Sequence, residues 1–338
     1  MTGKVQGPLG PARGGEAVRG SPEGGADREA GHLPVMVDEV LEILAPHPGS
    51  LQIDATLGGA GHAERILDAS APDGRLLGLD ADGAAVARAR ARLARFGERA
   101  VLRQVNFREL AEVAPVAGFR AVDGLLLDLG LSSYQLADTA RGFGFRAGGR
   151  LDMRFDASRG RSAAELLATL DADELTDIFR RYGEERFAGR IARAIADTRA
   201  RTPIETAEQL AALVERVVPA PRVRRIHPAT RVFQALRIAV NDELGALQAG
   251  LTASLQLLRP GGRLAVLSYH SLEDRTVKRF IAEEQRGCSC PPRVPVCVCG
   301  RQPRLRSLGR SRTPSAREVQ LNPRSRSARL RGAERMAA

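Results

Sequence analysis

The chain has 338 residues, 43% of them hydrophobic, and a formal net charge of +11 at pH 7. A chain of this length holds one large domain or two modest ones, and this apolar share is enough for a buried core. No apolar run approaches the roughly 18 residues that span a bilayer. Residues 1–30 also lack the apolar stretch of a signal peptide, so we expect a cytoplasmic protein without membrane spans.

The chain opens with an extension and continues with alternating strands and helices. Residues 1–31 are rich in Gly and show no hydrophobic periodicity, which predicts disorder. From His32 onward, short apolar strands are separated by helical segments. We predict strands at residues 50–54, 74–80, 100–105 and 122–130. Continuous apolar strands between helices predict a parallel sheet covered on both faces.

The strand and helix rhythm is interrupted in the middle of the chain. From about residue 136 to 228 the signals are mainly helical, with no clear strand. The rhythm resumes with a helical stretch, a turn at RPGG (259–262) and a strand at residues 263–269. We therefore predict a doubly wound domain made of residues 32–135 and 229–335, with an inserted helical domain at residues 136–228.

The glycine-rich turn DATLGGAGH (54–62), after the first strand, is a candidate cofactor site. Asp80 ends the second strand, where a carboxylate can accept hydrogen bonds from both hydroxyls of a ribose. A dinucleotide would need the pattern G-x-G-x-x-G, but Glu64 stands at the third glycine position. Asp54 also suits a cofactor with a cationic sulfonium and ammonium. The pattern therefore favours S-adenosylmethionine over a dinucleotide, with a purely structural turn as the third interpretation.

The segments that carry a family resemblance occur in order along the chain. They are DATLGGAGH, LLLDLGLSSYQL (125–136), RGFGFR (141–146) with LDMRFD (151–156), YGEERFAGRIARAI (182–195), HPATRVFQALRIAVNDEL (227–244) and SYHSLEDRTVK (268–278). Together they resemble the bacterial 16S ribosomal RNA cytosine-N4 methyltransferase family. The likeness runs from about His32 to the closing segment at residues 322–335.

The resemblance implies a class I, Rossmann-like α/β methyltransferase with an inserted all-helical domain that recognises RNA. The implied reaction transfers a methyl group from S-adenosylmethionine to N4 of the decoding-region cytosine at position 1402 of 16S rRNA, within the 30S subunit. It also assigns cofactor-binding residues: Ala60, Gly61 and His62 at the methionine end, Asp80 at the ribose, Phe107 at the adenine, and Asp128 with Gln135 completing the pocket.

One position departs from the family pattern, and the same loop carries the candidate catalytic groups. The family commonly has Pro where this chain has Tyr134, so the loop loses a backbone restraint. Asp128 is our candidate catalytic residue, because an acceptor facing the N4 amine favours a pyramidal, nucleophilic nitrogen. The hydroxyls of Ser132 and Ser133 are further acceptors, or else cap the next helix.

Two more segments were weighed for RNA or substrate contact. One helical face is predicted to carry Arg231, Gln234 and Asn241. The resemblance favours a role of this face in an RNA-binding cleft, and a solvent-exposed surface without a ligand is the alternative. His270 and Glu273 follow the predicted strand at residues 263–269, where a structural role competes with substrate contact.

The last part of the chain is strongly basic. Residues 301–338 hold eleven Arg against Glu318 and Glu334, a net charge of +9. Such a segment is typical of nucleic-acid binding, with a solvated tail as the alternative. We predict that Arg304, Arg306, Arg310 and Arg312 add RNA affinity but no choice of target, since no aromatic residues are interleaved. Residues 327–335 are a candidate closing strand.

The four cysteines form the pattern C-x-C-x6-C-x-C at Cys288, Cys290, Cys297 and Cys299. In a cytosolic protein such a cluster suggests metal before disulfides. The C-x-C spacing is tighter than the usual C-x2-C of zinc knuckles. We therefore predict a reduced loop without metal, with zinc as the alternative.

Two rival functions remain at this point. A dinucleotide-dependent oxidoreductase would need the missing third glycine. A non-catalytic RNA-binding or ribosome assembly protein would share the basic tail but would not need Asp54, Asp80 and Asp128, all of which are present. The enzyme is therefore favoured.

Overall fold

The computed structural model describes residues 34–144, 149–219, 227–288, 290, 296 and 298–337. Residues His32–Ala338 form one compact unit. The extension at residues 1–31, predicted to be disordered, lies outside the described residues. Among the described helices, none is long and apolar enough to cross a membrane.

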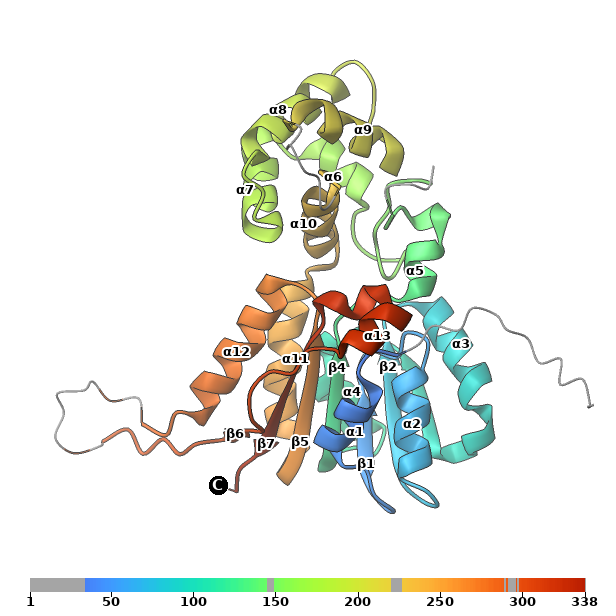
Figure 1. Cartoon of the computed structure of the whole chain (residues 1–338), viewed down its shortest axis with the longest axis vertical. Helices are drawn as coiled ribbons and strands as arrows, with labels where there is room; N and C mark the ends of the chain where they lie inside the picture. Colours follow the sequence, from blue (N-terminus) through green and yellow to red (C-terminus); the bar gives the residue numbers. More distant parts are fainter. Residues whose placement is uncertain are drawn as a thin grey trace, which may run out of the picture. The chain divides into compact units, whose positions relative to one another are not determined.

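A mostly parallel sheet forms the centre of the described chain (Figure 1). Its seven described strands lie in the order β3-β2-β1-β4-β5-β7-β6. Strands β1 to β5 pair in parallel, whereas β7 is antiparallel to both β5 and β6. The strands are β1 Leu51–Asp54, β2 Arg75–Asp80, β3 Ala100–Gln104, β4 Val122–Asp128, β5 Leu258–Ser268, β6 Leu305–Ser307 and β7 Arg329–Arg335. The doubly wound α/β class predicted from the sequence is therefore confirmed.

The strand at residues 263–269 begins earlier than predicted. β5 starts at Leu258, so the RPGG segment lies inside the strand instead of forming a separate turn. Gly261 has a φ of 79°, and the pairing of β5 with β4 shifts register between Val122 and Gly124. The sequence signal for a turn therefore marks an irregularity within a strand.

Helices cover both faces of the sheet. Because side chains alternate between the faces of a strand, Leu125 and Leu127 enter one buried cluster and Leu126 the other. The first cluster is covered by α4 Leu110–Val116, α11 Glu243–Leu257 and α12 Ser271–Gln285. The second is covered by α1 Val37–Leu44, α2 Gly61–Ala69 and α3 Gly83–Leu93. This double cover explains why β4 is a continuous apolar run.

A third buried cluster belongs to the inserted helices (Figure 1). The insertion is helical as predicted: in its described residues the only pairing of strand type is an isolated bridge between Arg150 and Thr206. Its helices are α5 Ser133–Ala137, α6 Ala163–Thr169, α7 Ala172–Gly183, α8 Ala188–Arg199 and α9 Ala207–Val217. Short 3-10 helices among the described residues are η1 Ala94–Arg99, η2 Phe107–Glu109, η3 Thr139–Arg141 and η4 Pro323–Ser327.

The packing of α10 (Thr230–Asn241) differs from the expected domain boundary. Val232 and Leu236 are fully buried in the cluster of the inserted helices, whereas the boundary predicted after residue 228 assigned them to the sheet domain. α10 ends at Asp242, whose left-handed φ of 45° turns the chain into α11. On packing grounds, the helical insertion therefore extends through Asn241.

The basic C-terminal segment is folded onto the sheet. It supplies β6, α13 (Ala316–Leu321), η4 and the antiparallel β7, so the predicted closing strand is confirmed. The guanidinium groups of Arg304, Arg306 and Arg312 form ion pairs with Glu284, Glu334 and Glu42. These contacts tie the segment to the rest of the fold, and the RNA affinity expected of Arg304, Arg306, Arg310 and Arg312 stays a prediction.

Candidate active site

The loops after β1 and β4 meet where the strand order reverses. β1 pairs with β2 on one side and with β4 on the other, and ligands of open parallel sheets bind beyond the carboxyl ends of the strands at this point. Gly58, in the turn after β1, has a φ of 49°, which glycine adopts without steric cost. Ala60 is also left-handed and fully buried before α2. The turn is thereby fixed at the reversal point.

A first pocket at this edge brings together four of the predicted cofactor residues. Asp80, Phe107, Asp128 and Gln135 line it, together with Gly58. They come from the end of β2, the 3-10 helix after β3, the end of β4 and α5. Four elements that are distant in the sequence thus converge on one cavity.

The carboxylate of Asp80 is held by main-chain amides. The N–H groups of Gly58 and Asp82 donate to its two oxygens at 2.8 Å each. Burial raises the pKa of Asp80 to about 6. In the described part of the chain, no ion pair with Arg or Lys compensates this carboxylate, so it suits a ligand that brings hydroxyl donors.

Phe107 also lines the first pocket and packs closely on α11. A Cβ at Gly250 would stand 2.8 Å from the Phe107 ring, so only glycine lets the ring approach the helix this closely. Ala246 and Leu247 of α11 line the same pocket. These apolar lining residues suit a flat heterocycle such as adenine.

A second pocket adjoins the first and contains Gly61 and His62. Both pockets share Thr56, Gly58, Asp128, Gly130 and Ser132. Ala60 lines neither of them, because its side chain is fully buried. Of the three residues predicted at the methionine end, Gly61 and His62 therefore line the second pocket. Ala60 belongs to the turn but does not line the pocket.

Asp128 stands on the border between the two pockets and has two polar partners. The Tyr269 hydroxyl donates to its Oδ1 at 2.9 Å, and His62 Nδ1 lies 3.5 Å from its Oδ2. The other ring nitrogen of His62 lies 2.9 Å from the carbonyl oxygen of Val35. Burial and the nearby Asp128 carboxylate raise the pKa of Tyr269 well above its ordinary value, so Tyr269 keeps its proton and acts as a donor.

Sequence reasoning missed Tyr269 and a buried ion pair. Asp82 is 4% exposed and accepts a hydrogen bond from Arg141 at 2.6 Å and one from Gln135 at 3.4 Å. Arg141 also donates to the carbonyl oxygens of Arg154 and Phe155. Phe155 lines the first pocket, so this arginine ties the insertion to the cofactor edge. Its place in the RGFGFR motif was the available signal.

Ser132 caps α5, as one of the two interpretations proposed. The Ser132 hydroxyl oxygen accepts a hydrogen bond from the main-chain N–H of Gln135 at 3.1 Å. In return, the side-chain Oε1 of Gln135 accepts one from the main-chain N–H of Ser132 at 3.0 Å. Tyr134, where the family commonly has Pro, is 37% exposed and stacks with Arg88 at 4.4 Å.

The polar face of α10 makes hydrogen bonds within the fold, and its expected role in RNA binding stays a prediction. Arg231 and Gln234 donate to the carbonyl oxygens of Glu184 and Tyr182 at 3.0 Å each. Asn241 donates to Met153 O and accepts from the N–H of Phe155, at 2.8 Å each. These side chains hold the main chain of the insertion in place.

His270 and Glu273 also have a structural role. They form a capping box at the start of α12, in which Glu273 accepts from the N–H of Tyr269 at 2.8 Å. Glu273 also lines the first pocket. The capping contacts fix Tyr269, which in turn contacts Asp128.

A third pocket lies between the sheet edge and the insertion. Leu129, Tyr269 and His270 line it from the sheet side, and Phe143 and Phe233 from the insertion. It shares Gly130, Leu131, Leu136, Arg237 and Tyr269 with the second pocket. The aromatic residues of this pocket can stack on a flat base, and one of them, Tyr269, donates a hydrogen bond to Asp128.

The fold and the site together define a class. The features that define it are a doubly wound sheet, a glycine turn after β1, a carboxylate at the end of β2 that suits a ribose, and an acidic residue at the end of β4. This combination is typical of an S-adenosylmethionine-dependent methyltransferase. The chain belongs to the MraW methylase family, whose model matches residues 29–336. This membership excludes the dinucleotide oxidoreductase that the glycine turn left open.

Comparison with curated proteins gives the same result. The chain is 58% identical over 307 residues to "Ribosomal RNA small subunit methyltransferase H" of Thermomicrobium roseum, covering 90% of this chain and 94% of that protein. It is 52% identical to the protein of the same name in Syntrophotalea carbinolica, covering 90% and 98%.

Two solved structures with a similar fold are more distant in sequence. An rRNA methylase from Streptococcus thermophilus matches with a TM-score of 0.39 and 13% identity, covering 90% of this chain and 99% of that one. The N-methyltransferase NodS from Bradyrhizobium japonicum matches with a TM-score of 0.39 and 9% identity, covering 89% and 94%. Likeness at this level supports no argument about substrate.

Proposed function

We propose that this protein transfers a methyl group from S-adenosylmethionine to N4 of the cytosine at position 1402 of 16S rRNA, in the small ribosomal subunit. Its curated relatives carry the name of a small-subunit ribosomal RNA methyltransferase. The choice of cytosine N4 rests on the resemblance of the six sequence segments. The observation that carries the proposal is the Asp128 carboxylate, held by Tyr269 between two adjoining pockets.

The first pocket fits the adenosyl part of the cofactor. Asp80 is fixed by two amides and has acceptor capacity for ribose hydroxyls, and Phe107 supplies an apolar wall for adenine. The turn containing Gly58 and Gly61 lets the main chain approach the methionine end. When bound, S-adenosylmethionine supplies an electrophilic methyl group.

Asp128 and Tyr269 act on the target amine. The lone pair of a cytosine amine is delocalised into the ring, so the amine is a poor nucleophile until it becomes pyramidal. A carboxylate that accepts a hydrogen bond from N4–H favours that geometry, and it can take the proton that N4 must lose as the new N–C bond forms. Tyr269 fixes the position of this carboxylate through its 2.9 Å hydrogen bond.

The third pocket supports an extruded target base. Phe143, Phe233 and Tyr269 offer aromatic surface between the insertion and the strand ends. Enzymes that modify a base take it out of the stack, at a cost of a few kcal/mol that falls when the base is already unpaired. A base in this cleft would lie beside Asp128, which a stacked base could not reach.

The test compares particles and variants. Methyl incorporation from labelled S-adenosylmethionine is measured on naked 16S RNA, 30S subunits and 70S ribosomes. We expect incorporation on the 30S subunit, with Asp128→Asn slower by roughly a hundredfold or more. Asp197→Asn, an exposed acidic residue in α8, is the matched control and should behave as wild type.

Three results would count against the proposal. Equal rates on all three RNA substrates would contradict recognition of a particle. A fully active Asp128→Asn enzyme would contradict the catalytic assignment. Absence of any incorporation by wild-type protein would favour the non-catalytic RNA-binding alternative.

A further inference from the structure

The loop between α12 and β6 leaves and returns through a narrow neck. The N–H of Arg304 donates to Glu284 O at 2.8 Å, and the Arg301 guanidinium donates to Glu283 O at 3.1 Å. A Cβ at Gly287 would stand 3.3 Å from the Pro303 ring. These contacts join the segment that leaves α12 to the segment that returns to β6. Described cysteines lie in both segments, just beyond these contacts.

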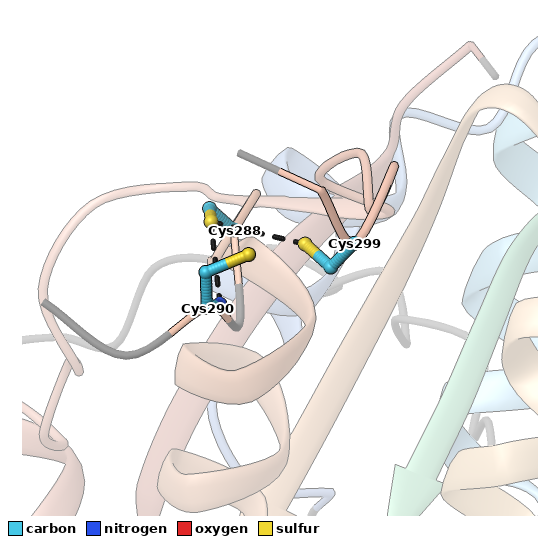
Figure 2. Close-up of side chains that lie close together, drawn as sticks. All are labelled: Cys288, Cys290 and Cys299. Atoms are coloured by element: carbon cyan, nitrogen blue, oxygen red, sulfur yellow. Dashed lines mark hydrogen bonds between the residues drawn. The ribbon is translucent and has the colours of Figure 1, made fainter. Parts of the chain in front are cut away.

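Three cysteine sulfurs converge at this neck (Figure 2). The Sγ atoms of Cys288, Cys290 and Cys299 all lie within 4.8 Å of one another. Cys288 and Cys299, eleven residues apart, have their sulfurs 3.8 Å from each other. The sequence interpretation favoured a metal-free loop because C-x-C is a tight spacing, but convergence across the neck does not depend on that local spacing.

The sulfur separation matches a tetrahedral metal better than a disulfide. A Zn–S bond of about 2.3 Å places two ligands of a tetrahedron about 3.8 Å apart. A disulfide needs about 2.05 Å between the sulfurs. The Cys288–Cys299 separation therefore has the value of two thiolates on one zinc ion.

The chemistry of the cluster is also that of a zinc site. Sulfur ligands select zinc over magnesium or calcium, which prefer oxygen. The N–H of Cys290 donates to Cys288 Sγ at 3.3 Å, and such outer hydrogen bonds stabilise a ligand thiolate. Cys288 and Cys299 are exposed, so a metal ion has a path to them from solvent.

We propose that Cys288, Cys290 and Cys299 bind a zinc ion that ties the two ends of the α12–β6 loop together. None of the three lines the first, second or third pocket, so the ion has a structural role and takes no part in methyl transfer. Cys297, two residues before Cys299, lies outside the described residues. The geometry of the proposed site uses the three described thiols alone.

The main test is the metal content of the purified full-length protein, produced in zinc-supplemented medium and measured by plasma mass spectrometry. We expect about one zinc per chain, falling to background when Cys288, Cys290 and Cys299 are all replaced by Ser. Val298→Ser is the matched control: Val298 is 81% exposed and stands between two cysteines, and its replacement should leave the zinc content unchanged.

Cobalt substitution of the wild-type protein keeps the test independent of variant folding. Tetrahedral cobalt thiolate sites have strong visible d–d bands and a sulfur-to-metal charge-transfer band. We expect both on adding Co²⁺ to the reduced, metal-stripped protein, and their loss on adding Zn²⁺. A wild-type protein that binds neither metal would overturn the proposal, and so would equal zinc content in the triple variant. Thiols that become titratable only after reduction would show a disulfide and equally overturn it.

Discussion

Asp80 has both carboxylate oxygens engaged by main-chain amides at the mouth of the first pocket. We predict that Asp80→Ala lowers the affinity for S-adenosylmethionine by about ten- to a hundredfold, because charge-assisted hydrogen bonds to the ribose are worth about 1.5–3 kcal/mol. Titration calorimetry checks this, with circular dichroism confirming the fold. Unchanged affinity in a folded variant would refute the assignment.

Asp54 makes the stability of the free protein depend on pH. It is 1% exposed, and burial raises its pKa to about 6 from an ordinary value of 3.8. Because the folded state binds the proton more tightly, this group stabilises the fold at low pH, and the stabilisation is lost as the pH rises through 6. We expect its contribution to the free energy of unfolding to be about 1 kcal/mol larger at pH 5 than at pH 7.

Urea unfolding of wild type and Asp54→Asn at pH 5 and pH 7 measures this contribution. The gain in unfolding free energy between pH 7 and pH 5 should be smaller in Asp54→Asn by the same amount. An identical pH dependence in both proteins would mean that Asp54 titrates normally in the fold.

In the proposed mechanism, Tyr269 contributes to catalysis by positioning Asp128. Tyr269→Phe keeps the ring but removes the hydroxyl that donates to Asp128 Oδ1. We predict that kcat falls about tenfold or more, since a hydrogen bond to a charged group is worth about 1.5–3 kcal/mol. KM for S-adenosylmethionine should stay near the wild-type value. If KM rose and kcat did not change, Tyr269 would serve cofactor binding instead.

Several site residues were predictable because they follow strands that the sequence identifies. Asp80 and Asp128 end strands with clear apolar patterns, and parallel strands bring such ends to one edge. Tyr269 was not predictable as a partner of Asp128, because 141 residues and the whole insertion separate them. The buried pair of Asp82 and Arg141 was missed for a related reason: the local sequence does not show which charged side chains will be buried.

At the scale of elements, hydrophobic periodicity and composition predicted where the strands lie. They predicted the boundary between the sheet domain and the insertion less well. The run LLLD predicts a strand covered on both faces, and the two clusters around β4 confirm it. α10 has an apolar stripe that would fit either domain. Only its tertiary packing on α7 shows which one receives Val232 and Leu236.

Two further arginines of the C-terminal segment are candidates for RNA contact. Arg324 and Arg326 are exposed beside the second pocket, and no ion pair is recorded for them within the described residues. We predict that the double variant Arg324→Gln, Arg326→Gln binds 30S subunits more weakly than wild type. The slope of the logarithm of the binding constant against the logarithm of the salt concentration should become less steep by about two. Filter binding at several salt concentrations measures both.

Arg310 and Arg317 provide the matched control for this pair. They are equally exposed but line none of the three pockets. Replacing both by Gln removes the same charge, and we expect a smaller loss of affinity. Equal losses in the two double variants would show a diffuse basic surface without a preferred RNA path.

At the scale of the whole molecule, the insertion and the sheet both line the third pocket, which we propose receives the target base. Arg141 and Asn241 link the 153–155 segment of the insertion to the edge of the first pocket. Phe143 and Phe233 of the insertion line the third pocket together with Tyr269. A cleft built from both parts can read the shape of a particle with one wall and hold a base with the other.

The central claim is methylation of a cytosine amine, and mapping the methylated nucleotide tests it most directly. 30S subunits from cells lacking this protein are incubated with enzyme and cofactor, and the 16S RNA is digested and analysed by mass spectrometry. We predict a single added methyl group on the base of the cytosine at position 1402, identified as N4-methylcytidine. A methyl group on a ring carbon, on ribose or on another nucleotide would contradict the account.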